Sequence, residues 1–352
     1  MSHLNRHPIV SEDLQRITEA ALPWQDLEES TVVITGAAGL VASYLVEALL
    51  FRNEQHSGHA IRVVATVRNT AAAKERFAAY LGRRDFEILH HDATEPLRYE
   101  RRIQYLVHAA GNATPSAFGR DPIGTYAPNV LGTHHLMARA KADETRGVLF
   151  LSSGAVHGAL DPEAPPLSES IYGSVDPLDP RASYAESKRM GETICRSWWV
   201  QHGVPVRMAR LGHSYGPGMR RSDERAFAQF VFCALDGRDI VLNSDGSAVR
   251  PYCYLADATV ALLLILLSGG NGEAYLVANT EAMCSIRELA ELVASLAPHQ
   301  VTVRRAESAP PVEYLPNRDP FHRLDTSKII SLGWRPQTHL RDGFRRTLDS
   351  YR

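Results

Sequence analysis

The chain has 352 residues, of which 44% are hydrophobic, and a formal net charge of −2 at pH 7. This length suits one large α/β domain or slightly more, and the balanced charge excludes charge-driven binding to nucleic acid or to a membrane surface. The four scattered cysteines and the polar N-terminus, which does not resemble a signal peptide, predict a cytoplasmic protein with reduced thiols. The longest apolar run, Thr259 to Leu267, is too short to span a bilayer, and we predict no metal site.

Residues 1–30 are predicted to form a helical extension that packs outside the main domain. Ser11 is the expected cap of a helix with an acidic first turn, and Leu14 and Ile17 then share one apolar face. No function for this extension follows from its residues.

The segment from Thr31 to Leu50 combines a strand, a glycine turn and a helix. The β-branched run TVVIT predicts a strand buried on both faces, and the turn GAAG that follows it has no bulky side chain. Such a turn lets the backbone approach a pyrophosphate, while the helix N-terminus offers N–H groups to the anion. An ordinary strand–helix turn is the less favoured interpretation. The residues expected to contact the cofactor diphosphate are Gly36, Ala38, Gly39, Leu40 and Val41, with Ala42 in the third small position.

The second predicted strand, residues 61–67, ends without the acidic residue that binds the adenosine ribose of NAD. Arg68 stands there instead. It can accept the 2′-phosphate of NADP, stack on adenine or face solvent. These residues alone therefore leave NAD and NADP both open.

Three further strands are predicted at residues 86–89, 105–107 and 148–151. Their alternation with helical segments predicts an α/β fold with a doubly wound parallel sheet, in which ligands bind at the carboxyl ends of the strands. Asp92 is placed to accept from the adenine amino group, although an ordinary turn aspartate fits equally well. The residues that we expect near the cofactor after these strands are Asp92, Ala93, Ala109, Ala110, Gly111 and Asn129, with Ser153 at the end of the last strand.

The segment Ser183-Tyr184-Ala185-Glu186-Ser187-Lys188 carries the chemically most informative spacing. In a helix, Tyr184 and Lys188 share one face. A free tyrosine has a pKa of about 10, and a nearby lysine cation favours its phenolate. Tyr184 can then exchange a proton with a substrate hydroxyl that Ser153 also hydrogen-bonds.

Together these motifs resemble the extended short-chain dehydrogenase/reductases, in the branch of NAD-dependent nucleotide-sugar epimerases, dehydratases and decarboxylases. The matching segments are TGAAGLVASYL, HAAGNATP, the NVLGT helix, LSSGAVHG, YAESK, RLGHSYGPGM, RPYCYLADA and the C-terminal NRDPFHRLDTSKIISLGWRP. The resemblance implies a Rossmann domain, mainly residues 31–205, and a smaller α/β substrate domain, mainly residues 206–352, interleaved with the first. The nucleotide diphosphate of a sugar would lie between them.

The resemblance also implies roles for single residues. Ser153, Tyr184 and Lys188 map onto the family's catalytic set, and Lys188 would hold the ribose of a bound NAD. NADP is not excluded, because of Arg68. On the substrate side the implied residues are Thr114, Ser153, Gly154, His213, Arg225, Arg250 and Arg323. Arginine forks suit diphosphate oxygens, and Arg250 is the favoured one because RPYCYLADA matches closely.

The departures from the family pattern concern the residues after Ser153. Dehydratases of the family carry an acid pair in a motif like STDEVYG, and decarboxylases keep the glutamate, whereas this chain has Gly154 and Ala155. Removal of water across C5 and C6 needs a base and an acid there, so 4,6-dehydration is disfavoured and decarboxylation less strongly so. His157 replaces a usual tyrosine, either beside the sugar or as a structural imidazole.

Three hypotheses follow. The first is an NDP-sugar 4-epimerase that works through a 4-keto sugar with retained NAD. The second is a 4-dehydrogenase or a decarboxylase that acts on a nucleotide uronic acid. The third is a non-catalytic nucleotide-binding protein, which ranks last because the tyrosine–lysine pair is intact.

The resemblance implies a homodimer built from two helices of each subunit. Here these are residues 129–142 and 184–202, and the second presents Ile194, Trp198, Trp199 and Val200. These side chains are apolar enough for an interface, although a core role fits them nearly as well.

Overall fold

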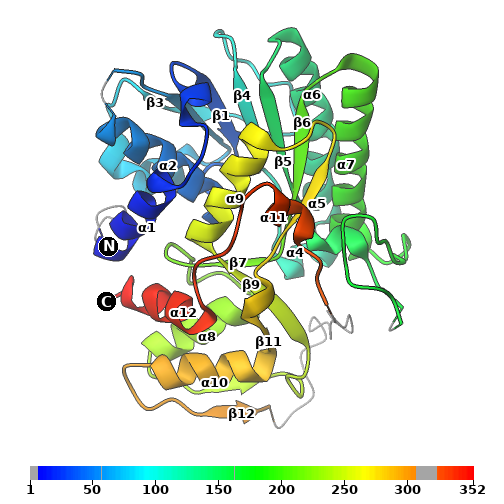
Figure 1. Ribbon diagram of the computed structural model, residues 1–352. Coiled ribbons are helices and arrows are strands. Elements are labelled where there is room, and N and C mark those ends of the chain that lie inside the picture. Colours follow the sequence, from blue (N-terminus) through cyan, green and yellow to red (C-terminus); the bar gives the residue numbers. More distant parts are fainter. Residues whose placement is uncertain (1–6, 57, 162, 307–322) are drawn as a thin grey trace.

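The computed structural model describes residues 7–56, 58–161, 163–306 and 323–352 (Figure 1). Its centre is a seven-stranded sheet of order β10-β6-β5-β4-β1-β2-β3 in which all neighbours pair in parallel. The strands are β1 (Thr31–Thr35), β2 (Arg62–Val67), β3 (Phe86–His90), β4 (Tyr105–His108), β5 (Gly147–Ser153), β6 (Val206–Leu211) and β10 (Ala274–Val277). The predicted doubly wound parallel sheet is confirmed.

Helices cover both faces of this sheet because alternate residues of its strands pack on opposite sides. On β5, Leu149 and Leu151 belong to the hydrophobic cluster that includes α2 (Leu40–Gln55) and α9 (Leu255–Ser268). Val148 and Phe150 instead join the cluster that includes α6 (Thr133–Ala142) and α7 (Ala182–His202). The other helices are α1 (Pro8–Glu19), α3 (Thr70–Arg76), α4 (Pro115–Arg120), α5 (Pro122–Ala127), α8 (Ala226–Leu235), α10 (Ile286–Leu296), α11 (Ser327–Ser331) and α12 (Leu340–Asp349).

Smaller sheets lie at one end of the large sheet, together with α8, α10 and α12 (Figure 1). One has the order β11-β9-β7, and the other pairs β12 with β8. Their strands are β7 (His213–Tyr215), β8 (Ile240–Leu242), β9 (Val249–Tyr254), β11 (Met283–Ser285) and β12 (Val303–Arg305). The proposed domain division near residue 205 stays a prediction, with β6 and β10 returning the chain to the large sheet. The C-terminal segment that resembles the family begins outside the described residues.

The N-terminal extension packs against α2 and α9 through α1. The prediction that Ser11 caps this helix is wrong: α1 begins at Pro8, and His7 Nδ1 accepts from the Ile9 N–H at 3.3 Å. A proline in the first turn needs no N–H partner, so the helix can start one turn earlier. The buried Asp13 accepts from Tyr254 Oη at 2.7 Å and from Arg346 Nη2 at 2.8 Å. The extension thus ties α12 and β9 to the Rossmann helices.

The apolar run at residues 259–267 lies in α9 and is largely buried, as predicted. Among the described residues, no helix combines the length and the apolar character that a membrane crossing needs.

Both helices expected at a dimer interface are present, and the first of them starts with a π-helical turn. The first begins as a π-helix, Pro128–Gly132, and continues as α6, while the second is α7. Trp198 and Trp199 are only partly buried, and Val200 is 71% exposed. The homodimer itself stays a prediction.

Candidate active site

A cavity of about 1060 Å³ opens at the carboxyl ends of the parallel strands. Most of the predicted site residues line it: Ala38, Gly39, Leu40, Val41, Ala109, Gly111, Thr114, Ser153, Gly154, Tyr184, Lys188, His213, Arg225 and Arg323. Other predicted residues are not part of this lining: Gly36, Arg68, Asp92, Ala93, Ala110, Asn129 and Arg250. The structure therefore brings the expected catalytic set together with the glycine turn in a single cavity.

At the glycine turn, the backbone of Gly36 lies very close to the backbone of Ala110. Gly36 has φ +61°, and a Cβ atom there would lie 2.7 Å from Ala110 Cα. Only glycine tolerates both the conformation and the contact. Gly36 and Ala110 therefore lie packed against each other behind the lining residues, which explains why neither faces the cavity directly.

The hydrogen-bonded side chains of Thr35 and His108 hold the end of β4 close to the glycine turn. Thr35 Oγ1 accepts from the N–H groups of Ala109 and Ala110 at 3.2 and 3.1 Å, and lies 2.8 Å from His108 Nδ1. His108 Nε2 lies 3.0 Å from the Pro128 carbonyl, which can only accept. Nε2 therefore carries the proton, and Nδ1 accepts from the Thr35 hydroxyl. Burial lowers the pKa of His108 to about 3, so the imidazole is neutral.

Tyr184 and Ser153 both line the cavity, and their side chains are hydrogen-bonded to each other. Burial raises the pKa of Tyr184, whereas a hydrogen bond with Ser153 and the charge of Arg225 lower it. The Phe118 ring stacks on the Tyr184 ring with centroids 4.6 Å apart, and the Ser183 hydroxyl donates to the Phe118 carbonyl at 3.0 Å. Sequence motifs did not indicate Phe118, because the contact joins α4 to α7 across 66 positions of the chain.

Lys188 lies on the expected helix face, and its effect on the pKa of Tyr184 stays a prediction. Its Nζ donates to the Leu151 carbonyl at 2.6 Å and lies 5.9 Å from the Tyr184 ring centroid. Arg225 is a second cation near Tyr184, and its charge opposes the rise in the Tyr184 pKa that burial causes. Burial lowers the pKa of Lys188 to about 7, opposed by the charge of Glu192.

Glu192, which the sequence analysis did not single out, anchors the same helix face. Its carboxylate accepts from Ser152 Oγ at 2.6 Å and from Arg210 Nε and Nη2 at 2.9 and 2.7 Å. Arg210 is only 1% exposed. Ser152 lies in β5 and Arg210 in β6, so these contacts fix α7 against the ends of both strands and help to position Tyr184, Lys188 and Ser153 relative to one another.

Asn129 is fully buried in the π-helix. Its Nδ2 donates to the Thr125 carbonyl and to Ser187 Oγ, and its Oδ1 has no hydrogen-bond partner among the described residues. A Cβ atom at Gly111 would lie 3.0 Å from this Oδ1 and 3.6 Å from Lys188 Nζ. Asn129 therefore lies behind Gly111, close to the cavity without lining it.

The substrate-side arginines differ in their surroundings. Arg225 forms an ion pair with Asp223 at 2.6 Å and lies over the Phe227 ring. Arg323 is exposed at the cavity, whereas Arg250, the favoured one, is 4% exposed and donates to the Val249 carbonyl at 2.7 Å. Arg250 is thus buried and is not among the residues that line the cavity, although its charge acts on His213, which does line it.

His213 and His157 also line the cavity. Burial lowers the pKa of His213 to about 3, with the charges of Arg250 and Arg225 acting in the same direction. Burial lowers the pKa of His157 to about 4, and its Nδ1 lies 2.7 Å from the Ile171 carbonyl. Both rings are neutral at pH 7, so each offers one donor and one acceptor.

Arg68 and Asp92 lie outside the cavity lining. Arg68 is exposed, and its charge contributes to the lowered pKa of Asp92. Asp92 Oδ1 accepts from the N–H and the hydroxyl of Thr94 at 2.9 and 2.8 Å. Their contact with a cofactor stays a prediction.

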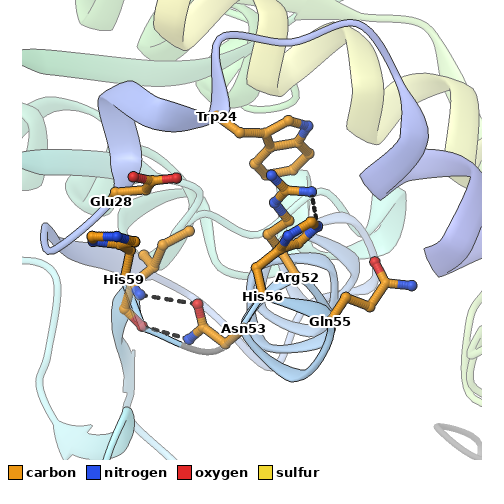
Figure 2. A pocket seen from close by; sticks show the side chains of 8 residues that line it. Trp24, Glu28, Arg52, Asn53, Gln55, His56 and His59 are labelled. Atoms are coloured by element: carbon orange, nitrogen blue, oxygen red, sulfur yellow. Dashed lines mark hydrogen bonds between the residues drawn. The ribbon is translucent and has the colours of Figure 1, made fainter.

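A second, polar pocket of about 310 Å³ lies beside the end of α2 (Figure 2). Arg52 stacks on Trp24 at 5.2 Å and contacts His56, while Asn53 pairs with the backbone of Ile61. Several polar groups of this pocket thus hydrogen-bond to one another. The pocket shares no lining residue with the large cavity.

Comparison with known proteins settles the family. A model of the NAD dependent epimerase/dehydratase family matches residues 32–278. The chain belongs to this family. UDP-glucuronic acid decarboxylase 3 from Arabidopsis thaliana is 33% identical over 314 residues, which cover 89% of this chain and 86% of the relative.

Solved structures of family members superpose on most of the chain. The dTDP-glucose 4,6-dehydratase DesIV from Streptomyces venezuelae, solved with NAD bound, gives a TM-score of 0.77 at 26% identity over 91% of this chain and 96% of that one. The UDP-glucose 4-epimerase from Thermotoga maritima gives 0.74 at 20% identity over 91% and 98%, which shows a common fold.

The residues at the glycine turn fit the cofactor of this NAD-dependent family. The turn and the first residues of α2 line the cavity, and positions 36–39 carry nothing larger than a methyl group. Tyr184 and Lys188 line the same cavity. A turn of small residues at a helix N-terminus is the residue pattern that a dinucleotide diphosphate requires, and the contacts of Tyr184 and Lys188 with the cofactor stay a prediction.

Proposed function

We propose that the protein is an NDP-sugar 4-epimerase that retains its NAD through the catalytic cycle. The observation on which this rests is the pairing of Ser153 with Tyr184 beside two positions, Gly154 and Ala155, that carry no carboxylate. A 4-epimerase needs a proton acceptor at the 4-hydroxyl and room for the 4-keto sugar to turn, but no acid or base at C5. The small residues after Ser153 leave that room.

Among the described residues, each carboxylate that lines the cavity has an ion-pair or hydrogen-bond partner. Asp179 and Asp223 pair with Arg181 and Arg225, and Asp161 and Asp176 accept from the N–H groups of Glu163 and Leu178. These contacts hold the carboxylates as structural acceptors. They support a reaction whose proton transfers run through Tyr184 alone.

In the proposed mechanism Ser153 orients the sugar 4-hydroxyl and Tyr184 takes its proton. Bound NAD would supply the hydride acceptor and donor for C4, and the charge of Arg225 would favour the Tyr184 phenolate. After the sugar has turned, Tyr184 gives the proton back to the oxygen on the inverted carbon. Lys188, buried one turn away, would hold the nicotinamide ribose.

Decarboxylation of a nucleotide uronic acid is a second candidate, favoured by the similarity to UDP-glucuronic acid decarboxylases. Oxidation at C4 makes the C6 carboxylate a β-keto acid, which loses carbon dioxide as the C5–C6 bond breaks. The electron pair then passes to the C4 oxygen, and C5 takes a proton before C4 is reduced. Ala155 cannot supply that proton, so another group would have to do so.

One experiment separates the two candidates. The purified protein, with no added cofactor, is incubated with UDP-glucose, UDP-N-acetylglucosamine and UDP-[6-¹³C]glucuronate, and the products are followed by NMR. An epimerase gives the C4 epimer of a substrate and retains the label at C6. Release of labelled bicarbonate would instead establish the decarboxylase, and neither product from any substrate would contradict both.

Tyr184→Phe tests the shared first step. It removes the proton acceptor, and we expect turnover to fall at least about 100-fold. The NAD content of the purified variant, measured by its absorbance after denaturation, should stay close to that of the wild type. Substantial residual turnover would refute the assignment of Tyr184.

A further inference from the structure

The loop after β7, residues 216–220, is held against the glycine turn by side chains from three parts of the chain. Arg220 Nη2 donates to the Ala38 carbonyl at 3.1 Å, and Arg76 Nη1 donates to the Gly218 carbonyl at 3.2 Å. The Tyr351 hydroxyl donates to the Met219 carbonyl at 2.6 Å. As a result, two guanidinium groups line the catalytic cavity together with Ala38 and Gly39.

The position of Arg76 depends on a glycine. Gly218 has φ +88°, and a Cβ atom there would lie 2.7 Å from Arg76 Nη2. Arg76 Nε is buried and has no hydrogen-bond partner within the described part of the chain. The guanidinium therefore fits closely beneath the loop and retains unused donor capacity.

The acidic residue near Arg76 compensates its charge only in part. Glu47 lies in α2, and burial raises its pKa to about 7, while the charge of Arg76 lowers it. Near neutral pH a large share of Glu47 is therefore protonated. Arg220 is exposed, and its described partner is a backbone carbonyl, which carries no net charge.

We propose that Arg76 and Arg220 bind the diphosphate of the NAD cofactor beside the glycine turn. The two phosphates carry two negative charges, which the partial charges of a helix N-terminus offset only in part. Guanidinium groups bind phosphate oxygens through charge-assisted, frequently bidentate hydrogen bonds. Arg76 comes from the Rossmann half and Arg220 from the loop after β7, so the cofactor would be held by both parts of the molecule.

This arrangement accounts for a cofactor that stays bound while the sugar exchanges. It rests on the NAD-dependence of the family and does not depend on whether the reaction is epimerisation or decarboxylation. Arg225, by contrast, lies near Tyr184 and Asp223 and remains the candidate for the sugar nucleotide. The two sets of arginines thus divide the cavity between two diphosphates.

The test measures NAD release from the purified holoprotein after transfer into NAD-free buffer. The variants are Arg76→Gln, Arg220→Gln and the double variant, with Arg221→Gln as the matched control, because Arg221 is exposed and pairs with Asp236 at 2.9 Å. We expect about tenfold faster release for each single variant and more for the double variant. The control should release NAD at the wild-type rate. Added KCl should accelerate release from the wild type more than from the double variant.

Further measurements distinguish a loss of NAD binding from misfolding and from a loss of sugar-nucleotide binding. Arg76→Lys and Arg220→Lys retain the charge and should restore part of the retention, and circular dichroism melting checks that each variant folds. Binding of UDP to each holoprotein, by calorimetry, should be unchanged in the position 76 and 220 variants. Unchanged NAD release would overturn the proposal, and so would weaker UDP binding with normal NAD release, which would place these arginines at the sugar nucleotide.

Discussion

The two halves of the catalytic cavity are built differently. Apart from the proposed Arg76 and Arg220, the expected cofactor half is made of backbone and small residues, namely the glycine turn and the β4 end, which the buried Thr35–His108 pair supports. The substrate half is made of side chains that come from distant segments, such as Phe118, His213, Arg225 and Arg323. A backbone-built site tolerates little change, whereas a side-chain-built site can be altered without loss of the fold.

Among the substitutions considered, we expect the largest loss of stability and of NAD at Gly36, where the glycine turn contacts the backbone of Ala110. Gly36→Ala places a Cβ atom 2.7 Å from Ala110 Cα at φ +61°. Overpacking and left-handed strain together should cost about 2 to 5 kcal/mol of unfolding free energy and abolish NAD retention. Urea unfolding and NAD content measure the two effects.

Gly82→Ala is the control for this substitution. Gly82 has φ +83°, but nothing lies within 4 Å of the added Cβ. It should cost only the strain of about 1 kcal/mol and leave the NAD content unchanged. Equal losses at both glycines would show that backbone strain, and not the approach to β4, decides the effect.

In the expected substrate half, a larger side chain should be tolerated without loss of the fold. Ala155 lines the cavity, and its N–H donates to Ser153 Oγ at 3.2 Å. Ala155→Glu installs the carboxyl group that the decarboxylases of the family keep, and should raise bicarbonate release from UDP-glucuronate about 10- to 100-fold. Ala155→Gln introduces a side chain of the same size as glutamate but without an acidic proton, so it should not raise bicarbonate release. A decarboxylation rate that is equal in all three proteins would show that position 155 plays no part in the outcome.

The same contrast explains what the sequence could predict. The sheet, the glycine turn and the Tyr184–Lys188 face follow from local periodicity, and these predictions agree with the structure. Contacts between remote segments left no local signal. Phe118 on Tyr184, Arg76 beneath Gly218 and the Glu192–Arg210 pair were therefore not foreseen.

One difference from expectation has a physical cause: Ser11 was expected to cap α1, but Pro8 allows an earlier start with His7 as the cap. The expected effect of Lys188 on the pKa of Tyr184 stays a prediction. The structure adds two contacts that the spacing did not indicate, the donation from Lys188 Nζ to the Leu151 carbonyl and the charge of Arg225 near Tyr184. Helical spacing fixes the face on which a long side chain lies, but not the acceptor that it finds.

A smaller effect distinguishes two buried threonines that face each other across β1 and β2. Thr35→Val leaves the N–H groups of Ala109 and Ala110 without their acceptor, which should cost about 1 to 3 kcal/mol. Thr66 is paired with Thr35 in the sheet, and its hydroxyl has no hydrogen-bond partner among the described residues. Thr66→Val should therefore be nearly neutral in urea unfolding. A comparable loss in both variants would contradict the role given to Thr35.

A further expected effect is a dependence of stability on pH. The folded pKa of His108 is lowered from 6.5 to about 3, because burial disfavours the charged ring and the charge of Lys188 acts in the same direction. Below pH 6.5 the unfolded chain binds a proton that the folded chain excludes, so stability is complete above pH 6.5 and falls as the pH drops toward 3. His213 and His157, with pKa values lowered to about 3 and 4, act in the same direction from the substrate half.

Unfolding free energies at pH 6.5, 6.0, 5.5 and 5.0 should therefore decline, with each of these histidines contributing at most about 1.4 kcal/mol per pH unit. His108→Gln removes one of the three contributions and should make the decline shallower, whatever it does to the stability at pH 7. His299→Gln is the matched control, since that residue is exposed. A decline that is equally steep in His108→Gln and in the wild type would mean that the His108 ring accepts a proton while folded. The Thr35–His108 pair would then not be the rigid support of the cofactor half.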